Sequence, residues 1–127
     1  MITKSEAVEL VKEFLEGDLK KEEWFRNVQD YVKAIILYGS VSKGTNRPDS
    51  DVDVLVILPL GVEEKCTKGE YVYTYKNFEI NIVCRSIEKL RALATAEEKD
   101  LFQREVFRDS EIIWEADSEI KTLIESL

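Results

Sequence analysis

The residues from Gly39 to Asp53 combine a glycine–serine pair with two closely spaced aspartates. The surrounding sequence is "LYGSVSKGTNRPDSDVDVLVIL" over residues 37–58. Side chains alternate between the faces of a strand, so Asp51 and Asp53 share one face while the intervening valines lie on the other. Neighbouring carboxylates repel each other, and burying them unpaired is costly. The spacing therefore predicts a bound cation, and a hard ion such as Mg²⁺ prefers oxygen ligands.

A third carboxylate lies in the run "FEINIVCR" at residues 78–85. Glu79 and Asn81 share one face of this predicted strand. If the strand lies beside the one that carries Asp51 and Asp53, Glu79 becomes the third carboxylate of the site. Three carboxylates can hold two metal ions about 3.5–4 Å apart, which is the arrangement used for in-line phosphoryl chemistry.

The turn that precedes the aspartates suits phosphate groups. Gly39 permits a sharp turn and a close backbone approach to a ligand. The hydroxyl group of Ser40 and the backbone N–H groups of a following helical turn can hold phosphate oxygens. Lys43 and Arg47 lie in the same loop, with Gly44 beside them, and can add positive charge. Phosphate ligands at one end and carboxylates at the other predict a site for a metal–nucleotide complex.

Two known loop motifs do not fit these residues. A P-loop would need lysine where Thr45 stands, and an EF-hand loop that starts at Asp49 would need glycine in place of Val54. Both are rejected, and Asp49 itself is interpreted as a solvated charge. Ser40 could simply cap a helix, and Glu79 could pair with a neighbouring cation. Lys43 and Arg47 could equally be ordinary loop cations.

The rest of the chain predicts alternating helices and strands. Thr3 and Glu6 form a capping-box pattern at the start of an amphipathic helix, and Lys76-Asn77 is typical of a hairpin turn between two strands. We expect helices at 3–17, 20–31, 86–107 (in one or two pieces) and 117–127, and strands at 32–39, 51–58, 71–75, 78–85 and 111–116. This order predicts a single α/β (α+β) domain over residues 1–127, with a small mixed sheet and helices packed mainly on one face.

Composition narrows the class of function. The chain has 18 basic and 26 acidic residues, a net charge of −8, which disfavours nucleic acid as a partner. It has no histidine, which excludes chemistry based on a histidine general base. Only two cysteines, no apolar leader and no run of transmembrane length lead us to expect a cytoplasmic protein without a membrane contact.

The glycine–serine pair and the two aspartates together resemble a known family signature. Gly39-Ser40, then Gly44, then Ser50-Asp51-Val52-Asp53 resembles the signature of the nucleotidyltransferase superfamily, which includes DNA polymerase β, poly(A) polymerases and CCA-adding enzymes. "YKNFEINIVCRSIEKL" and "FQREVFRDSEIIWEA" resemble the N-terminal domain of kanamycin-type nucleotidyltransferases. In that domain the third acidic residue lies in a similar V-E-x-N strand, which favours Glu79 over Asn81.

The resemblance implies a fold and a set of roles. It implies a nucleotidyltransferase fold in which Asp51, Asp53 and Glu79 hold two Mg²⁺ ions, while Gly39 and Ser40 bind the phosphates of a nucleoside triphosphate such as ATP. A nucleoside monophosphate would pass to an acceptor hydroxyl, with release of pyrophosphate.

The chain also lacks an acceptor-binding domain within its 127 residues. In this it resembles minimal nucleotidyltransferases, which often pair with a small helical HEPN protein in toxin–antitoxin-like modules and can adenylylate that partner. A protein adenylyltransferase is therefore one expectation. The alternative is an antitoxin-like binding module that docks on its partner and has weak or vestigial nucleotide transfer.

Overall fold

A computed structural model describes residues 1–63, 69–95 and 101–127, and within these ranges five strands form one sheet in the order β3-β4-β2-β1-β5. Strands β2 and β4 run parallel, and the other neighbouring pairs are antiparallel. The strands are β1 (Ala34–Tyr38), β2 (Val52–Leu58), β3 (Glu70–Tyr75), β4 (Phe78–Ser86) and β5 (Glu111–Glu115). The helices are α1 (Lys4–Glu16), α2 (Glu23–Val28), α3 (Gly39–Lys43), α4 (Leu60–Glu63), α5 (Ile87–Ala94), α6 (Leu101–Arg108) and α7 (Glu119–Glu125), with 3₁₀ turns at Leu19–Lys21 and Gln29–Tyr31.

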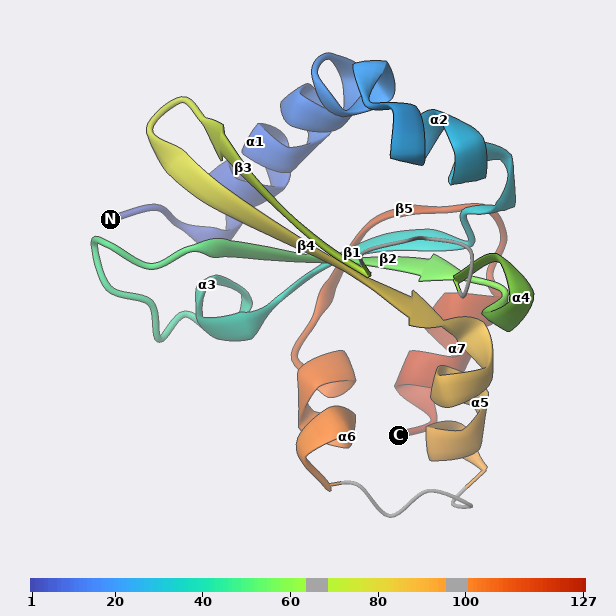
Figure 1. The fold of residues 1–127 in the computed structure, drawn as a ribbon. Helices are drawn as coiled ribbons and strands as arrows, with labels where there is room; N and C mark the ends of the chain where they lie inside the picture. The colour runs from blue at the N-terminus through green and yellow to red at the C-terminus, as the bar shows by residue number, and fades with distance from the viewer. Residues whose placement is uncertain (64–68, 96–100) are drawn as a thin grey trace.

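Helices cover both faces of the sheet, whereas we expected them mainly on one. Helices α1 and α2 lie above the sheet in Figure 1, and α5, α6 and α7 lie below it. The reason is that the central strands are apolar on both sides. In β1, Ile35 and Leu37 belong to the core under α1 and α2, while Ala34 and Ile36 belong to the core against α5 and α7. A strand that is apolar on both faces needs a cover on each.

The predicted start of the first helix is confirmed. Thr3 Oγ1 accepts a hydrogen bond from the backbone N–H of Glu6, and the Glu6 carboxylate accepts one from the N–H of Thr3, which completes the capping box. Ala7, Leu10, Val11, Phe14 and Leu15 form the buried side of α1. This stripe fixes α1 across one face of the sheet.

The predicted hairpin is also confirmed. Lys76 and Asn77 have positive φ angles of 48° and 70°, as a two-residue turn of the I′ type requires. Strand β3 therefore pairs directly with β4, in a register that sets Tyr73 opposite Ile80. The hairpin brings Tyr71, Tyr73 and Tyr75 onto the α1 side, where Phe14 packs against two of their rings.

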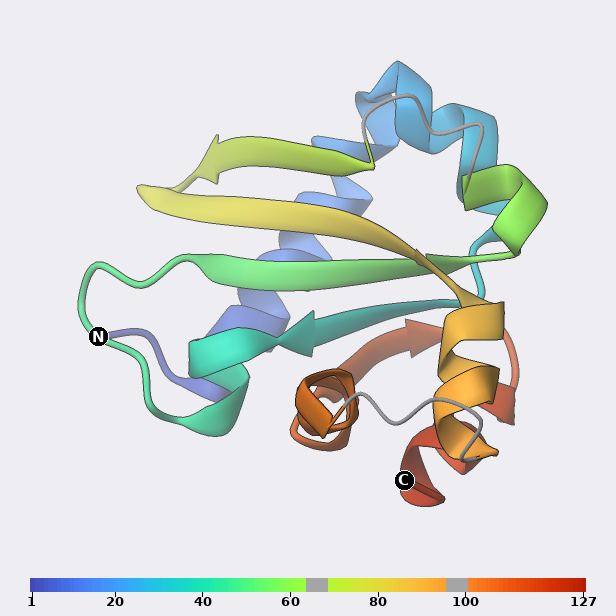
Figure 2. The same cartoon turned by 60° about the horizontal axis from the view of Figure 1, so that its bottom comes forward.

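The helical segment predicted after β4 is in two described pieces, α5 and α6, and residues 96–100 between them lie outside the described ranges. Ser86 caps α5 by accepting from the N–H of Lys89, and the Asp117 carboxylate accepts from the N–H of Glu119 at the start of α7. Leu90, Leu93, Phe107 and Ile120 pack together on this side. These helices cover only one end of their sheet face (Figure 2).

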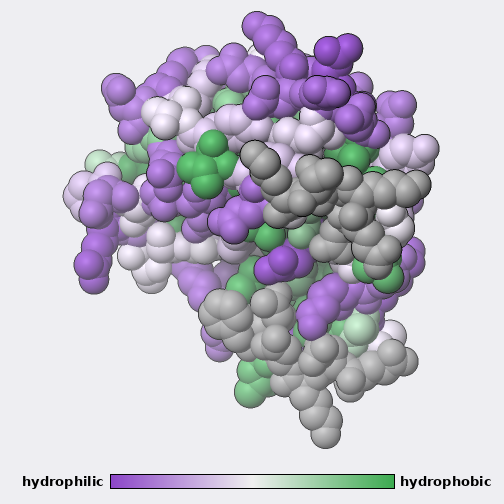
Figure 3. Space-filling view, viewed as in Figure 1, coloured by the Kyte–Doolittle hydropathy of each residue, from purple (hydrophilic) through white to green (hydrophobic). Residues whose placement is uncertain are grey.

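The surface over α1 and α2 is strongly hydrophilic. Figure 3 shows hydrophilic residues gathered over α1 and α2 at the top of the molecule, in keeping with the net charge of −8. Within the described ranges, no helix combines the length and the apolar character that crossing a bilayer requires.

Candidate active site

The two aspartates lie where β2 begins, on the part of the sheet that α5, α6 and α7 leave open. The parallel pairing sets Asp53 opposite Asn81, and the antiparallel pairing sets it opposite Tyr38. Val52 pairs with Ile80, so Asp51 and Glu79 each stand one residue before that pair. In Figure 2 the first halves of β2 and β4 extend beyond the helices of this face. The predicted neighbourhood of Asp51, Asp53 and Glu79 on adjacent strands therefore exists.

Asn81 joins the two aspartates. Its side-chain Nδ2 donates to Oδ2 of Asp51 at 3.0 Å and lies 3.5 Å from Oδ1 of Asp53. The second contact is at the outer limit for a hydrogen bond, so the contact with Asp51 is the stronger of the two. An amide N–H between two carboxylates offsets part of their repulsion.

The surroundings of the Asp53 carboxyl group disfavour its charged form. Its pKa is raised chiefly by burial, and the neighbouring charges of Asp51 and Glu79 add to that rise, while the hydrogen bond from Asn81 opposes it. A positive ion at this position would reverse the balance of charge. The environment of Asp53 therefore favours a bound cation.

Gly39 directly follows β1 and begins α3, with its backbone against Asp53. Its φ angle is +81°, in the left-handed region that favours glycine. A Cβ atom at this position would lie 2.5 Å from Oδ2 of Asp53, which is far closer than non-bonded atoms tolerate. Glycine is thus required here twice, once for the backbone conformation and once for the space that Asp53 occupies.

Helix α3 follows this turn and is fixed at its far end. The buried Ser42 donates from Oγ to the backbone oxygen of Asp109 at 2.5 Å, and Asn46 donates to the backbone oxygen of Ile2 at 2.9 Å. Ser40 lies in the first turn of α3, whose N-cap residue, Tyr38, makes no capping hydrogen bond through its side chain. The loop that carries the predicted phosphate ligands is therefore held to the body of the protein at two points.

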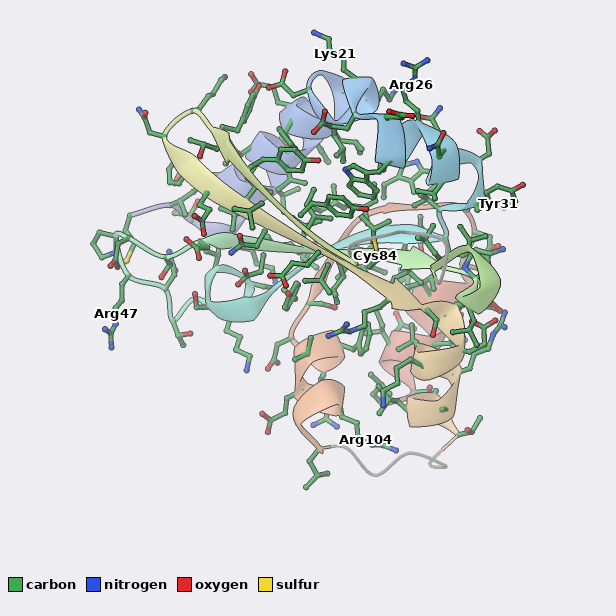
Figure 4. The ribbon with its side chains drawn as sticks, viewed as in Figure 1. Lys21, Arg26, Tyr31, Arg47, Cys84 and Arg104 are labelled. Atoms are coloured by element: carbon green, nitrogen blue, oxygen red, sulfur yellow. The ribbon has the colours of Figure 1, made fainter. Side chains whose placement is uncertain are left out.

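The two predicted cations of this loop do not converge on the aspartates. Lys43 Nζ lies 3.8 Å from a carboxylate oxygen of Asp109, at the end of α6. Arg47 is exposed, and in Figure 4 its side chain points outward from the loop before β2. Both remain predictions as phosphate ligands.

The donor set fits a hard divalent cation. The candidate ligands are carboxylate oxygens, which a hard cation prefers. Asp51 and Asp53 are partly buried, and Glu79 is exposed on the same face of the sheet. In the arrangement described, no three acidic, histidine or cysteine side chains among the described residues form a metal-ligating group. Asp51 and Asp53 thus form the preassembled pair, and Glu79 stays a predicted third ligand.

The sequence interpretation missed two further residues that the sheet brings to this site. Tyr38 is partly buried, and its pKa is raised by burial and by the charge of Asp53, while the positive charge of Arg85 opposes the rise. Arg85 pairs with Ile57 in the register of β2 and β4, farther along the same face. The alternation of β4 could have placed Arg85 on the face of Asn81, but the position of Tyr38 depends on the antiparallel register of β1.

Comparisons with known proteins bear on the family and the fold of the chain. The family model of the nucleotidyltransferase domain matches residues 19–123. The fold is similar to a nucleotidyltransferase-like protein from Exiguobacterium sibiricum 255-15, with 15% identity, a TM-score of 0.52, and 85% of this chain covered. The chain spans only 37% of the length of that protein. A structure described as a toxin–antitoxin with AMP-PNP matches at 16% identity and a TM-score of 0.45, over 86% of this chain and 82% of the other. No curated protein matches the sequence.

Proposed function

The chain belongs to the nucleotidyltransferase domain family, and we propose that it moves a nucleoside monophosphate from a nucleoside triphosphate to an acceptor hydroxyl group. The acceptor oxygen forms a bond to the α-phosphorus, the bond from that phosphorus to the leaving oxygen breaks, and pyrophosphate departs. The observation that carries the proposal is the Asp51–Asp53 pair, set against the Gly39 turn on an open part of the sheet.

Each residue of the site has a task in this reaction. Asp51 and Asp53 would hold Mg²⁺, which when bound would supply positive charge for the triphosphate and acidify the acceptor hydroxyl. Gly39 and Ser40 bind the β- and γ-phosphates through backbone N–H groups and the serine hydroxyl. Glu79 would be a third ligand for the metal, and because the chain has no histidine, it is the side chain to which we assign the acceptor proton.

Positioning and charge supply most of the rate in phosphoryl transfer. The paired strands that carry or flank the site residues suit this need for fixed positions. Asp53 and Glu79 lie on the paired strands β2 and β4, Asp51 directly precedes β2, and Gly39 directly follows β1, so one hydrogen-bonded sheet sets their relative positions.

We further propose that the nucleotide is ATP and that the acceptor is a hydroxyl group of a separate helical protein of the HEPN type. Two observations support a macromolecular acceptor. The helices α5, α6 and α7 leave the first halves of β2 and β4 uncovered (Figure 2), and the net charge of −8 favours a basic protein over a nucleic acid.

The test uses the protein, Mg²⁺, and each of the four ribonucleoside triphosphates, with and without a candidate helical protein of the HEPN type. Intact mass spectrometry should find one added adenosine monophosphate on the partner, and pyrophosphate should accumulate with it. The Asp51→Asn/Asp53→Asn protein should give neither product. Efficient transfer to a small molecule or an RNA end, without a mark on the partner, would favour a stand-alone enzyme. Tight partner binding with no transfer would favour the docking module.

A further inference from the structure

The side-chain amide of Asn81 lies between the carboxylates of Asp51 and Asp53. Its Nδ2 lies 3.0 Å from one carboxylate and 3.5 Å from the other. Among the described residues, its side chain makes no other hydrogen bond. On its outer side in the sheet it pairs with Val72, which is 57% exposed. The amide is therefore not needed to satisfy a buried partner elsewhere, and its contacts are directed at the carboxylates alone.

The contacts also distinguish the oxygens of each carboxylate. Asn81 takes Oδ2 of Asp51 and approaches Oδ1 of Asp53. The other oxygen of Asp53, Oδ2, is the one that faces Gly39 and the start of α3. Asn81 thus engages one oxygen of each aspartate, and among the described residues the other oxygen accepts no hydrogen bond. For Asp53 this second oxygen lies against the turn at which we place the phosphates.

We propose that Asn81 is a positioning residue, whose side-chain amide fixes the side chains of Asp51 and Asp53 in one arrangement before the cation binds. By engaging one oxygen of each carboxylate, Asn81 also determines which oxygens bind the cation. This inference rests on the proposed function, since it assigns the aspartates to a divalent cation. Outer-shell hydrogen bonds of this kind orient metal ligands, and their removal typically weakens metal binding about 10–100-fold.

Two substitutions separate the parts of this role. Asn81→Leu keeps a side chain of similar size but removes the donor. Asn81→Asp keeps the shape and replaces the donor with a third carboxylate close to Asp51 and Asp53. The same two changes at Asn27 serve as matched controls, because Asn27 is exposed on α2, which covers the opposite face of the sheet.

The measurements are Mn²⁺ binding, followed by the loss of the free Mn²⁺ spin-resonance signal, and melting temperature in chelator and in Mn²⁺. Asn81→Leu should bind Mn²⁺ about 10–100-fold more weakly than the wild type. Asn81→Asp should melt lower than Asn27→Asp in chelator, because three carboxylates then face one another, and it should gain more from Mn²⁺ than the wild type does. The Asn27 proteins should bind Mn²⁺ like the wild type.

Each other outcome has a defined meaning. Wild-type or tighter Mn²⁺ binding by Asn81→Leu overturns the positioning role. If Asn81→Leu fails to fold by circular dichroism, Asn81→Asp decides, and a melting temperature in chelator equal to that of Asn27→Asp overturns the inference. If the wild type itself binds no Mn²⁺, the proposed function fails, while the comparison in chelator still tests whether Asn81 holds the carboxylates together.

Discussion

Replacing Gly39 with alanine gives the sharpest test of how the phosphate turn is joined to the aspartates. Gly44 is a matched control in the same loop, because its φ angle of +75° is close to the +81° of Gly39. A Cβ atom at Gly44 would meet nothing within 4 Å, whereas at Gly39 it would lie 2.5 Å from Oδ2 of Asp53. The two alanine proteins therefore share the backbone strain and differ in the overlap with Asp53.

The two costs can be estimated separately. Left-handed backbone costs an alanine about 1–2 kcal/mol, and this applies at both positions. At Gly39 the carboxylate of Asp53 must also turn away, which costs about 0.5–1.5 kcal/mol for a displaced rotamer and weakens its contact with Asn81. We therefore expect Gly39→Ala to lower the free energy of unfolding by about 1–2 kcal/mol more than Gly44→Ala does.

A double-mutant cycle isolates this extra cost. Urea unfolding in chelator is measured for Gly39→Ala, Asp53→Ala and the double variant, with Gly44→Ala in both backgrounds as control. In the Asp53→Ala background the overlapping oxygen is gone, so Gly39→Ala should cost only as much as Gly44→Ala. A coupling energy below about 0.5 kcal/mol between positions 39 and 53, which is within ordinary additivity, would refute the reasoning.

Three further predictions follow from the same site and its surroundings. Calorimetric titration should show ATP binding that depends on Mg²⁺, and equal ATP affinity in Mg²⁺ and in chelator would contradict a metal site at Asp51 and Asp53. Glu79→Gln should abolish transfer and, in chelator, leave the melting temperature equal or higher because a like charge is removed; a clear drop would indicate a structural ion pair instead. Burial raises the pKa of Tyr73 from 10.0 to about 12, so the folded protein holds its proton where the unfolded chain loses it, and stability should fall as the pH rises from 10 towards 12. Melting scans at alkaline pH should show a smaller fall for Tyr73→Phe, and an identical fall would mean that Tyr73 does not carry the effect.

Local features of the fold were predictable because their causes lie within a few residues. The capping box of α1 needs only Thr3 and Glu6, and the hairpin turn needs only Lys76 and Asn77. The sharing of a face by Asp51 and Asp53 follows from strand alternation alone, and their face is confirmed by the opposite, buried positions of Val52 and Val54.

The cover on both faces of the sheet was not predictable in the same way. A short apolar run such as residues 34–37 indicates burial, but not which helices supply the cover on each side.

The contacts of Asn81 could not be predicted from the sequence either. A neutral amide carries no charge that marks it as part of a site, and its contacts with the aspartates arise only from the parallel pairing of β2 with β4. Tyr38 likewise reaches Asp53 through the pairing of β1 with β2.

The chemistry on the open face is fixed by packing on the opposite one. A shift of β4 by one residue would move Glu79 and Asn81 to the other side of the sheet, away from the aspartates. The residues that prevent this shift are Ile80, Ile82 and Cys84, which alternate with the site residues and are at most 2% exposed in the core beneath α1 and α2. Moving them to the open face would expose three apolar side chains, at about 1.5–3 kcal/mol for each large one. The core therefore holds the register, and the register places Asn81 beside both carboxylates.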